Sequence, residues 1–126
     1  YAIERAGIEA GEVEDVIFGC GQPEGATGHN IGRNVAIAGG CPVTVPGTTI
    51  NRFCSSGLQS IAVAAQRIIV DGINVAIGGG VESISMTQQN LNMKHLIEPE
   101  LQNSLAAKEV PLANGGYMEP TLQPFL

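Results

Sequence analysis

The stretch NRFCSSGLQS, residues 51–60, decides the fold because it joins an extended segment to a long helical pattern, with a cysteine at the junction. The run from Cys54 to Val70 contains few polar residues, and its other positions are small and apolar. This composition is typical of a helix that is buried on several sides. The pattern ends at Asp71 and Gly72, where glycine favours a left-handed cap. We therefore expect a buried helix that begins at Cys54.

The segments around this helix alternate between strand and helix patterns. The expected strands lie at 13–21, 43–51 and 73–80, and the two other helices at 1–7 and 30–40. Pro42 and Pro46 place the second of these strands at a sheet edge, because proline cannot donate to a ladder. Asn30 is the expected N-cap of the helix that follows it, and Gly7 the expected end of the first helix. The alternation predicts an α/β fold.

Composition excludes several classes of protein. The 126 residues carry a net charge of −6 without a block of like charge, so we expect no nucleic-acid partner. The longest apolar run is shorter than the roughly 20 residues that cross a bilayer, so we expect no membrane contact. The 3 cysteines are widely spaced, which argues against a disulfide framework and a zinc site. A soluble protein of the reducing cytoplasm fits best.

The last third of the sequence differs from the rest. Residues 83–126 are polar and contain Pro99, Pro111, Pro120 and Pro124. We expect an irregular region there with one short helix near 98–107. Because the chain opens without methionine and closes on GGYMEPTLQPFL, we also expect it to be a piece of a longer protein. The expected division is a partial α/β domain at 1–82 and the start of an irregular loop domain at 83–126.

The predicted position of Cys54 has a chemical consequence. The first N–H groups of a helix have no partner within the helix and carry partial positive charge, which stabilises a thiolate. Ser55, Ser56 and Gly57 are small enough to admit an acyl group and to leave N–H groups facing an oxyanion. A nucleophile is one interpretation of Cys54. The other is a small buried hydrophobic residue, the commoner fate of a free cysteine.

Other residues are weaker candidates. His29 could pair with Cys54, but it lies in a glycine-rich loop and a solvated histidine is the expected state; His95 is weaker still. Glu82 could be catalytic, although capping or hydrogen bonding to the backbone is the expected use. Cys20 and Cys41 have no cationic neighbour in the sequence and are expected to be inert. Neither glycine-rich segment has the spacing of a phosphate-binding loop.

The segments TINRFCSSGLQSIAVAAQRI and NVAIGGGVESIS resemble the nucleophile segment and the following GG-x-ES-x-S strand end of the thiolases. The resemblance extends over roughly residues 1–87. Thiolases are acyl-CoA acyltransferases that make or cleave 3-ketoacyl-CoA. The resemblance implies a layered α/β/α domain with a mixed sheet and a buried helix that starts at the nucleophilic cysteine.

The resemblance also implies which strands are present. In thiolases the strand nearest the N-terminus lies at the centre of this sheet, and no segment of this chain matches it. The strands at 13–21 and 73–80 would then have no neighbour between them, and their buried backbone groups would have to find partners elsewhere.

By the same resemblance, Cys54 takes the acyl group as a thioester. A histidine in a G-H-P motif activates the thiolase cysteine, a second cysteine in C-x-G moves the substrate proton, and an N-E-A-F asparagine helps to hold an oxyanion water. None of these three motifs occurs in the 126 residues. We therefore expect this chain alone to be inactive.

Substrates and partners follow from the family. We expect acyl-CoA and CoA as substrates, no cofactor or metal, and a dimer or tetramer of the full-length protein. Two alternatives remain open. One is a non-catalytic remnant or interaction module of thiolase fold, and the other is a ketosynthase-type condensing enzyme, which is also built around a cysteine at the start of a buried helix.

Overall fold

The structure is a computed structural model that describes residues 1–87, 110–111 and 117–118. The chain divides into two compact units, Tyr1–Asn90 and Leu91–Leu126. The α-helices of the first unit are α1 (Ala2–Ala6), α2 (Ile31–Ala38), α3 (Ser56–Asp71) and α4 (Ile84–Thr87), its strands are β1 (Asp15–Gly19), β2 (Gly47–Ile50) and β3 (Ala76–Gly80), and its short 3₁₀ turns are η1 (Ala10–Glu12) and η2 (Gly25–Thr27). In the second unit β4 (Val110–Pro111) pairs with β5 (Tyr117–Met118) in antiparallel fashion.

The three strands of the first unit form one parallel sheet in the order β2-β1-β3. On one side of β1, Val16 is opposite Gly47 of β2, and on the other side Asp15 is opposite Ala76 of β3. The predicted α/β class is therefore confirmed, and β2 lies at an edge, as Pro46 before it suggested. Among the described strands of this sheet all pairs are parallel, so the mixed character that the resemblance implied is not found in this part of the chain.

The direct pairing of β1 with β3 corrects one expectation. The resemblance implied that these strands lack a neighbour between them, yet Asp15–Gly19 pairs with Ala76–Gly80 along its whole length. The central strand that the resemblance implied is thus missing from the described part of this sheet, and the two strands on either side of it pair directly. Backbone N–H and C=O groups must be paired when buried. The two strands satisfy this requirement with each other.

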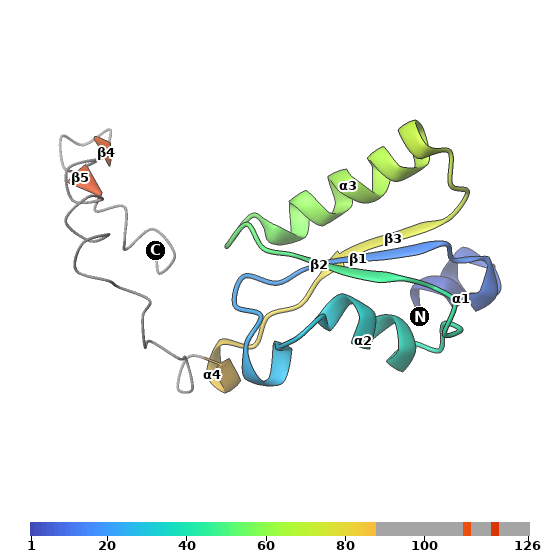
Figure 1. Cartoon of the computed structure of the whole chain (residues 1–126), viewed down its shortest axis with the longest axis horizontal. Helices are drawn as coiled ribbons and strands as arrows, with labels where there is room; N and C mark the ends of the chain where they lie inside the picture. The colour runs from blue at the N-terminus through green and yellow to red at the C-terminus, as the bar shows by residue number, and fades with distance from the viewer. Residues whose placement is uncertain (88–109, 112–116, 119–126) are drawn as a thin grey trace. The chain divides into compact units, whose positions relative to one another are not determined.

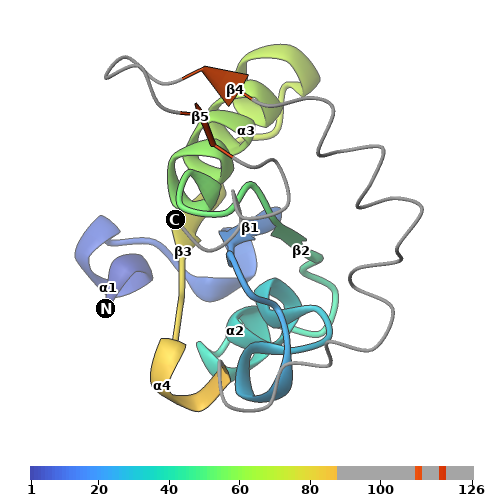
Figure 2. The same cartoon turned by 90° about the vertical axis from the view of Figure 1, so that its left-hand side faces the viewer.

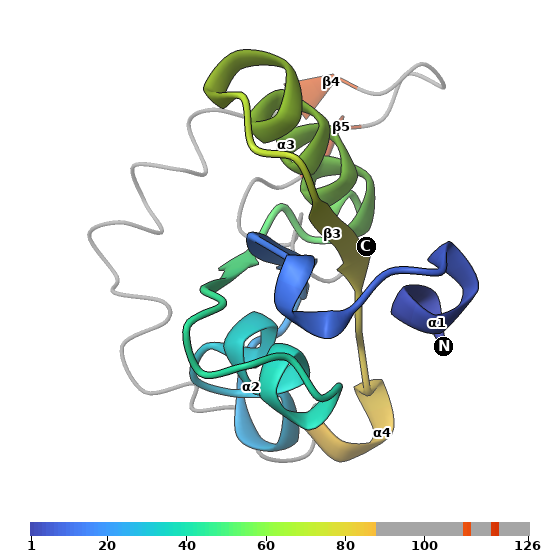
Figure 3. The ribbon, with the colours of Figure 1, turned by 90° about the vertical axis from the view of Figure 1, so that its right-hand side faces the viewer.

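Helices cover both faces of the sheet. In Figures 1 and 2, α3 lies on one side of β1, β2 and β3 and α2 lies on the other. Figure 3, seen from the opposite side, shows the same three layers. The physical reason is the handedness of crossovers between parallel strands. The path from β1 to β2 and the path from β2 back to β3 run in opposite directions, so right-handed connections place their helices on opposite faces.

The main hydrophobic core lies between the sheet and α2. Its buried residues come from β1, α2 and the segments that flank them: Val13, Val16, Ala36, Cys41 and Val45. Ile3 of α1 and Phe18 of β1 pack against this cluster. Arg33 of α2 donates hydrogen bonds to the carbonyls of Val43 and Val45, which fixes the turn that leads into β2. Short apolar side chains therefore make up most of this core.

On the opposite face of the sheet, α3 packs with its backbone very close to the strands. A Cβ atom added to Gly19 would lie 2.2 Å from the backbone carbon of Ser56, and one added to Gly78 would lie 2.9 Å from the Cα of Ile61. Ser60 is completely buried, and its hydroxyl donates to the carbonyls of Gly57 and Gly79. Glycines in the strands thus let the helix backbone approach the sheet, and Ser60 joins the two layers.

α3 differs from the expected helix in two respects. α3 begins at Ser56, so Cys54 precedes it, because a tight turn occupies the residues between β2 and the helix. In the described part of the chain its outward face is exposed, with Leu58 74 % and Ile69 79 % accessible. Among the described elements only the sheet covers this helix, so the expectation that it is buried on several sides is not met in the described part of the chain.

This helix also has the composition of a membrane-crossing segment. The 19-residue stretch Phe53–Asp71, which contains α3, includes an 18-residue window with a mean hydropathy of 1.2, of which 17 % is buried. No apolar run of sufficient length is expected from the sequence, yet by length and composition this helix qualifies. Core helices pass the same test. The absence of membrane contact therefore stays a prediction.

The region after β3 begins inside the first unit. Thr87 of α4 is buried, and its hydroxyl donates to the carbonyl of Ser83 and to the side chain of Gln22. The division at residues 82 and 83 stays a prediction. The helix expected near 98–107 lies outside the described residues.

Candidate active site

The candidate site lies where the parallel strands end. The chain leaves β1 at Cys20 and Gly21, leaves β2 towards Cys54, and leaves β3 towards Glu82. Because the strands are parallel, their carboxyl ends meet at one edge of the sheet. Ligands of open α/β sheets bind at this edge. The fold therefore gathers three segments that are far apart in the sequence.

Cys54 lies in a tight turn between β2 and α3. The side chain of Asn51 accepts a hydrogen bond from the Phe53 N–H at 2.9 Å, and the N–H groups of Ser55 and Ser56 donate to the carbonyls of Arg52 and Phe53, both at 3.0 Å. Phe53 has φ of 47°, which is uncommon for a bulky residue. These bonds turn the chain sharply and leave Cys54 exposed at the surface of the first unit.

Ser56 fixes this turn from the side of the helix. It is buried, its hydroxyl accepts from the Arg52 N–H at 2.8 Å, and the same hydroxyl donates to the Phe53 carbonyl. From their small size, Ser55 and Ser56 are expected to leave N–H groups for an oxyanion. That expectation is wrong for these two groups, because the turn carbonyls accept both of them. A Cβ atom added to Gly57 would meet no described atom within 4 Å, although the Gly57 backbone itself lies against Gly19 and Gly80.

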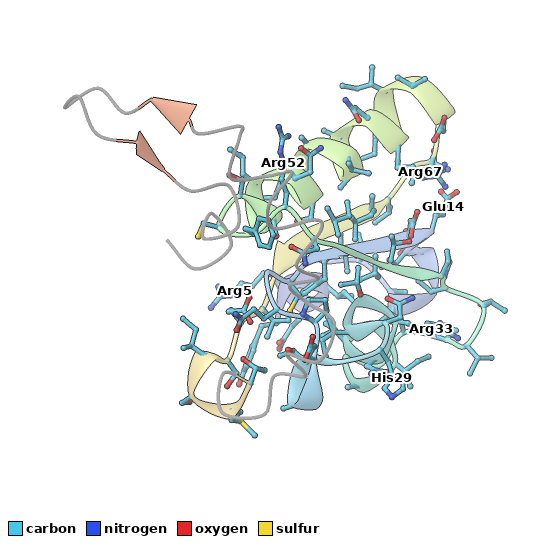
Figure 4. All side chains as sticks on the ribbon, turned by 60° about the vertical axis from the view of Figure 1, so that its left-hand side comes forward. Arg5, Glu14, His29, Arg33, Arg52 and Arg67 are labelled. Atoms are coloured by element: carbon cyan, nitrogen blue, oxygen red, sulfur yellow. The ribbon has the colours of Figure 1, made fainter. Side chains whose placement is uncertain are left out.

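Positive charge lies beside the turn. The guanidinium of Arg52 donates to the side-chain oxygen of Gln59, one turn into α3. Figure 4 shows Arg52 at the start of this helix, on the side of the sheet opposite to His29. The Ser55 side chain makes no capping hydrogen bond to the first turn of the helix. A helix start without a side-chain cap and with a nearby cation favours an anion at this position.

Glu82 holds the loop after β1 in place. Its Oε2 atom accepts from the N–H of Gly21 at 2.7 Å and from the N–H of Gln22 at 3.1 Å. Hydrogen bonding to the backbone is thus the use that the structure shows for Glu82, as expected. The sulfur of Cys20 lies 3.9 Å and 4.0 Å from the two carboxylate oxygens. The carboxylate therefore contacts three consecutive residues of this loop.

The remaining candidates are not brought to Cys54. His29 is exposed, has φ of 56°, and precedes α2 on the other side of the sheet (Figure 4). His95 lies outside the described residues. Cys20 and Cys41 are buried, which fits their expected inertness. Among the residues that the structure describes, no group of three His, Cys, Asp or Glu side chains could hold a metal ion.

Two features of the site are not among the expectations from the sequence. Nothing in the sequence indicates that Phe53 adopts a left-handed conformation, because bulky residues rarely do so. Gly21 had a usable signal, since a glycine directly after a buried strand often marks a close backbone approach. A Cβ atom on Gly21 would lie 2.9 Å from Glu82 Oε2 and 3.3 Å from the Phe53 carbonyl oxygen.

Comparison with known proteins places this geometry in a family. A family model described as "Thiolase, N-terminal domain" matches residues 1–115. A 3-ketoacyl-CoA thiolase of Bacillus subtilis is 42 % identical over 117 residues, which are 93 % of this chain and 29 % of that protein. A beta-ketoadipyl-CoA thiolase of Acinetobacter baylyi is 45 % identical over 84 residues, or 66 % of this chain and 21 % of that protein.

Solved structures give the same result. The Acat5 thiolase from Ascaris suum, crystallised in complex with coenzyme A, matches with a TM-score of 0.65 and 34 % identity, over 68 % of this chain and 22 % of that one. The chain thus spans less than a third of the length of these relatives. The match includes the β2-turn-α3 segment that carries Cys54, because the family model covers nearly the whole chain. The chain belongs to the thiolase family.

Proposed function

We propose that this chain carries the acyl-accepting cysteine of an acyl-CoA acyltransferase of the thiolase type, and that Cys54 is this residue. The observation that supports it is the position of Cys54, exposed in a tight turn ahead of α3 at the carboxyl edge of the sheet, within a segment of a thiolase N-terminal domain. The sulfur lies just before α3, whose N-cap Ser55 makes no side-chain capping hydrogen bond. It is also accessible to a bulky thioester.

The proposed reaction is acyl transfer through a Cys54 thioester. In the degradative direction the thiolate attacks the 3-keto carbon of a 3-ketoacyl-CoA. The bond between C2 and C3 breaks, and its electron pair leaves on acetyl-CoA as an enolate that takes up a proton. The thiol of free CoA then attacks the Cys54 thioester, releases the shortened acyl-CoA and returns the cysteine. In the synthetic direction an acetyl group passes from Cys54 to the enolate of a second acetyl-CoA.

The proton transfers of this cycle need groups that this chain does not contain. Its sequence has no G-H-P, C-x-G or N-E-A-F motif, and the structure does not bring His29 to Cys54. The proposed substrates are 3-ketoacyl-CoA and CoA, without a cofactor. The names of the relatives support this class, since one acts on a ketoacyl-CoA and another was crystallised with coenzyme A. A homo-oligomer of the complete enzyme and a cytoplasmic location are part of the proposal.

A chimera tests the proposed function. Residues 1–115 of this chain replace the matching segment of the Bacillus subtilis 3-ketoacyl-CoA thiolase, which supplies the rest of an active enzyme. We expect thiolytic turnover of acetoacetyl-CoA that is lost in Cys54→Ala, with acyl groups trapped on Cys54 in the unsubstituted chimera. A chimera that folds and assembles like the relative but has no turnover and no acyl-enzyme would contradict the proposal.

The same experiment separates the alternatives. A non-catalytic remnant predicts no acyl-enzyme in the chimera under any condition. A ketosynthase-type enzyme predicts that acyl groups reach Cys54 from an acyl carrier protein rather than from CoA thioesters. Offering both donors to the chimera distinguishes these two outcomes from thiolase chemistry.

A further inference from the structure

Three loops meet behind the turn that carries Cys54, and one carboxylate joins two of them. Glu82 follows β3, and its Oε2 atom accepts from the N–H groups of Gly21 and Gln22, which follow β1. Gly21 in turn lies against the backbone of Phe53, because a Cβ atom there would be 3.3 Å from the Phe53 oxygen and 3.4 Å from its carbonyl carbon. The Glu82 carboxylate therefore contacts the loop after β1, and this loop contacts the turn that carries Cys54.

The Phe53 carbonyl is the point where this contact reaches the turn. It accepts from the N–H of Ser56 at 3.0 Å and from the Ser56 hydroxyl, and these bonds set the start of α3. Phe53 itself has φ of 47°, a conformation that the surrounding structure has to maintain for a bulky residue. A loop that is fixed against this carbonyl limits how far the turn can relax.

We propose that Glu82 is a positioning residue for Cys54: its carboxylate holds the Cys20–Gln22 loop against the Phe53 carbonyl and so keeps the cysteine turn in its strained form. The inference rests on the proposed function, because it assigns a role in the same site. Glu82 does not touch the reacting atoms in this role. It acts through Gly21, and the absence of a side chain at Gly21 is part of the arrangement.

The 3 cysteines of the chain report on this arrangement separately. Cys54 reports on the turn, and Cys20, whose sulfur lies 3.9 Å from a Glu82 oxygen, reports on the loop. Cys41 lies in the core cluster with Val13 and Val16 and reports on the fold as a whole. The rates at which iodoacetamide labels each thiol, followed by peptide mass mapping, measure all three at once.

The experiment compares the unsubstituted chain with Glu82→Ala and Glu82→Gln. We expect Glu82→Ala to slow Cys54 labelling about tenfold, because hydrogen bonds to a charged acceptor are lost from the support of the turn. Cys20 labelling rises, and Cys41 labelling is unchanged. Glu82→Gln keeps one acceptor oxygen without the charge and recovers part of the Cys54 rate. Glu4→Ala, at an exposed position of α1, is the matched control and changes none of the rates.

A second variant approaches the same contact from the loop. Gly21→Ala places a Cβ atom 2.9 Å from Glu82 Oε2 and should give the same pattern of rates as Glu82→Ala. Because both changes break one contact, the double variant should lose little more than either single variant.

The outcomes are distinguishable from those of the proposed function. If Cys54 is not labelled ahead of the other thiols in the unsubstituted chain, the proposed function of Cys54 and the positioning role of Glu82 are both contradicted. If it is, and Glu82→Ala leaves its rate unchanged, only the positioning role is overturned. A parallel rise of all three rates also overturns it, since Glu82 would then support the whole fold rather than the turn.

Discussion

The Oε2 atom of Glu82 lies 2.7 Å from the backbone nitrogen of Gly21, a residue 61 positions earlier in the chain. The two residues follow β3 and β1, which pair directly in the sheet. Their contact is therefore a consequence of strand order. It joins the loops at the carboxyl edge, where the turn with Cys54 also lies.

Thiol reactivity should follow exposure and position. Cys54 is exposed ahead of α3, whereas Cys20 is 1 % accessible and Cys41 lies in the core. With limiting iodoacetamide near neutral pH we expect Cys54 to be labelled at least about ten times faster than either of the others. Peptide mass mapping gives the three rates. Equal labelling of all three cysteines would remove the argument for a nucleophile.

The chain by itself should not turn over acetoacetyl-CoA. The groups that activate the cysteine and move the substrate proton are absent from its sequence, and removing members of a catalytic unit costs about 10⁴-fold or more. A spectrophotometric assay of thiolysis with the purified chain should show no rate above background. Turnover that scales with the chain and disappears in Cys54→Ala would contradict this prediction.

The close approach of α3 to the sheet should make Gly19 intolerant of substitution. In Gly19→Ala the new Cβ atom would lie 2.2 Å from the Ser56 carbonyl carbon and 2.3 Å from its oxygen, so the helix must shift. We expect the free energy of unfolding to fall by at least about 2 kcal/mol. Gly57→Ala is the control, because no atom of the described residues outside the helix's own backbone lies within 4 Å of the added Cβ. Because alanine is more stable than glycine inside a helix, we expect Gly57→Ala to raise the free energy of unfolding by up to about 1 kcal/mol. Thermal unfolding followed by circular dichroism ranks the two variants.

Glu14 should contribute stability that depends on pH. Hydrogen bonds from the backbone and side chain of Asn74 lower the pKa of Glu14 below its ordinary value of 4.5. A lowered folded-state pKa gives stability that is present above the unfolded pKa and is lost as the pH falls through the folded one. The difference in unfolding free energy between wild type and Glu14→Gln should thus shrink as the pH is lowered from about 6 to below 4.5. Chemical denaturation at several pH values measures this difference in unfolding free energy. A difference independent of pH would refute the lowered pKa of Glu14.

The exposed face of α3 should promote self-association. Leu58 and Ile69 are 74 % and 79 % accessible, and burying a side chain of this size is worth about 1.5–3 kcal/mol. We expect the chain to self-associate through this face, and Leu58→Gln with Ile69→Gln to lower the apparent mass on sizing with light scattering. Val43→Gln, equally exposed but outside α3, is the control. A monodisperse monomer with a sharp, cooperative thermal transition would show the prediction to be wrong.

Much of the local structure could be predicted from the sequence. The first and third helices end on Gly7 and Gly72, both left-handed with φ of 69° and 73°. Asn30 caps α2 by accepting from the Arg33 N–H. Hydrophobic periodicity and glycine placement predicted these elements, because hydrogen bonds within a helix and its caps join residues a few positions apart. The position of Cys54 between a strand and a helix was predicted on the same grounds.

Only the tertiary structure decided which residues surround Cys54. The pairing of β1 with β3 depends on which strands are available to satisfy their backbone groups, and periodicity along one segment carries no information about that choice. The left-handed Phe53 and the contact of Glu82 with Gly21 follow from this pairing and from the close approach of α3. The sequence by itself determined the elements and the nucleophile candidate. The order of the strands, set by hydrogen bonds between residues about 60 positions apart, determined the site around it.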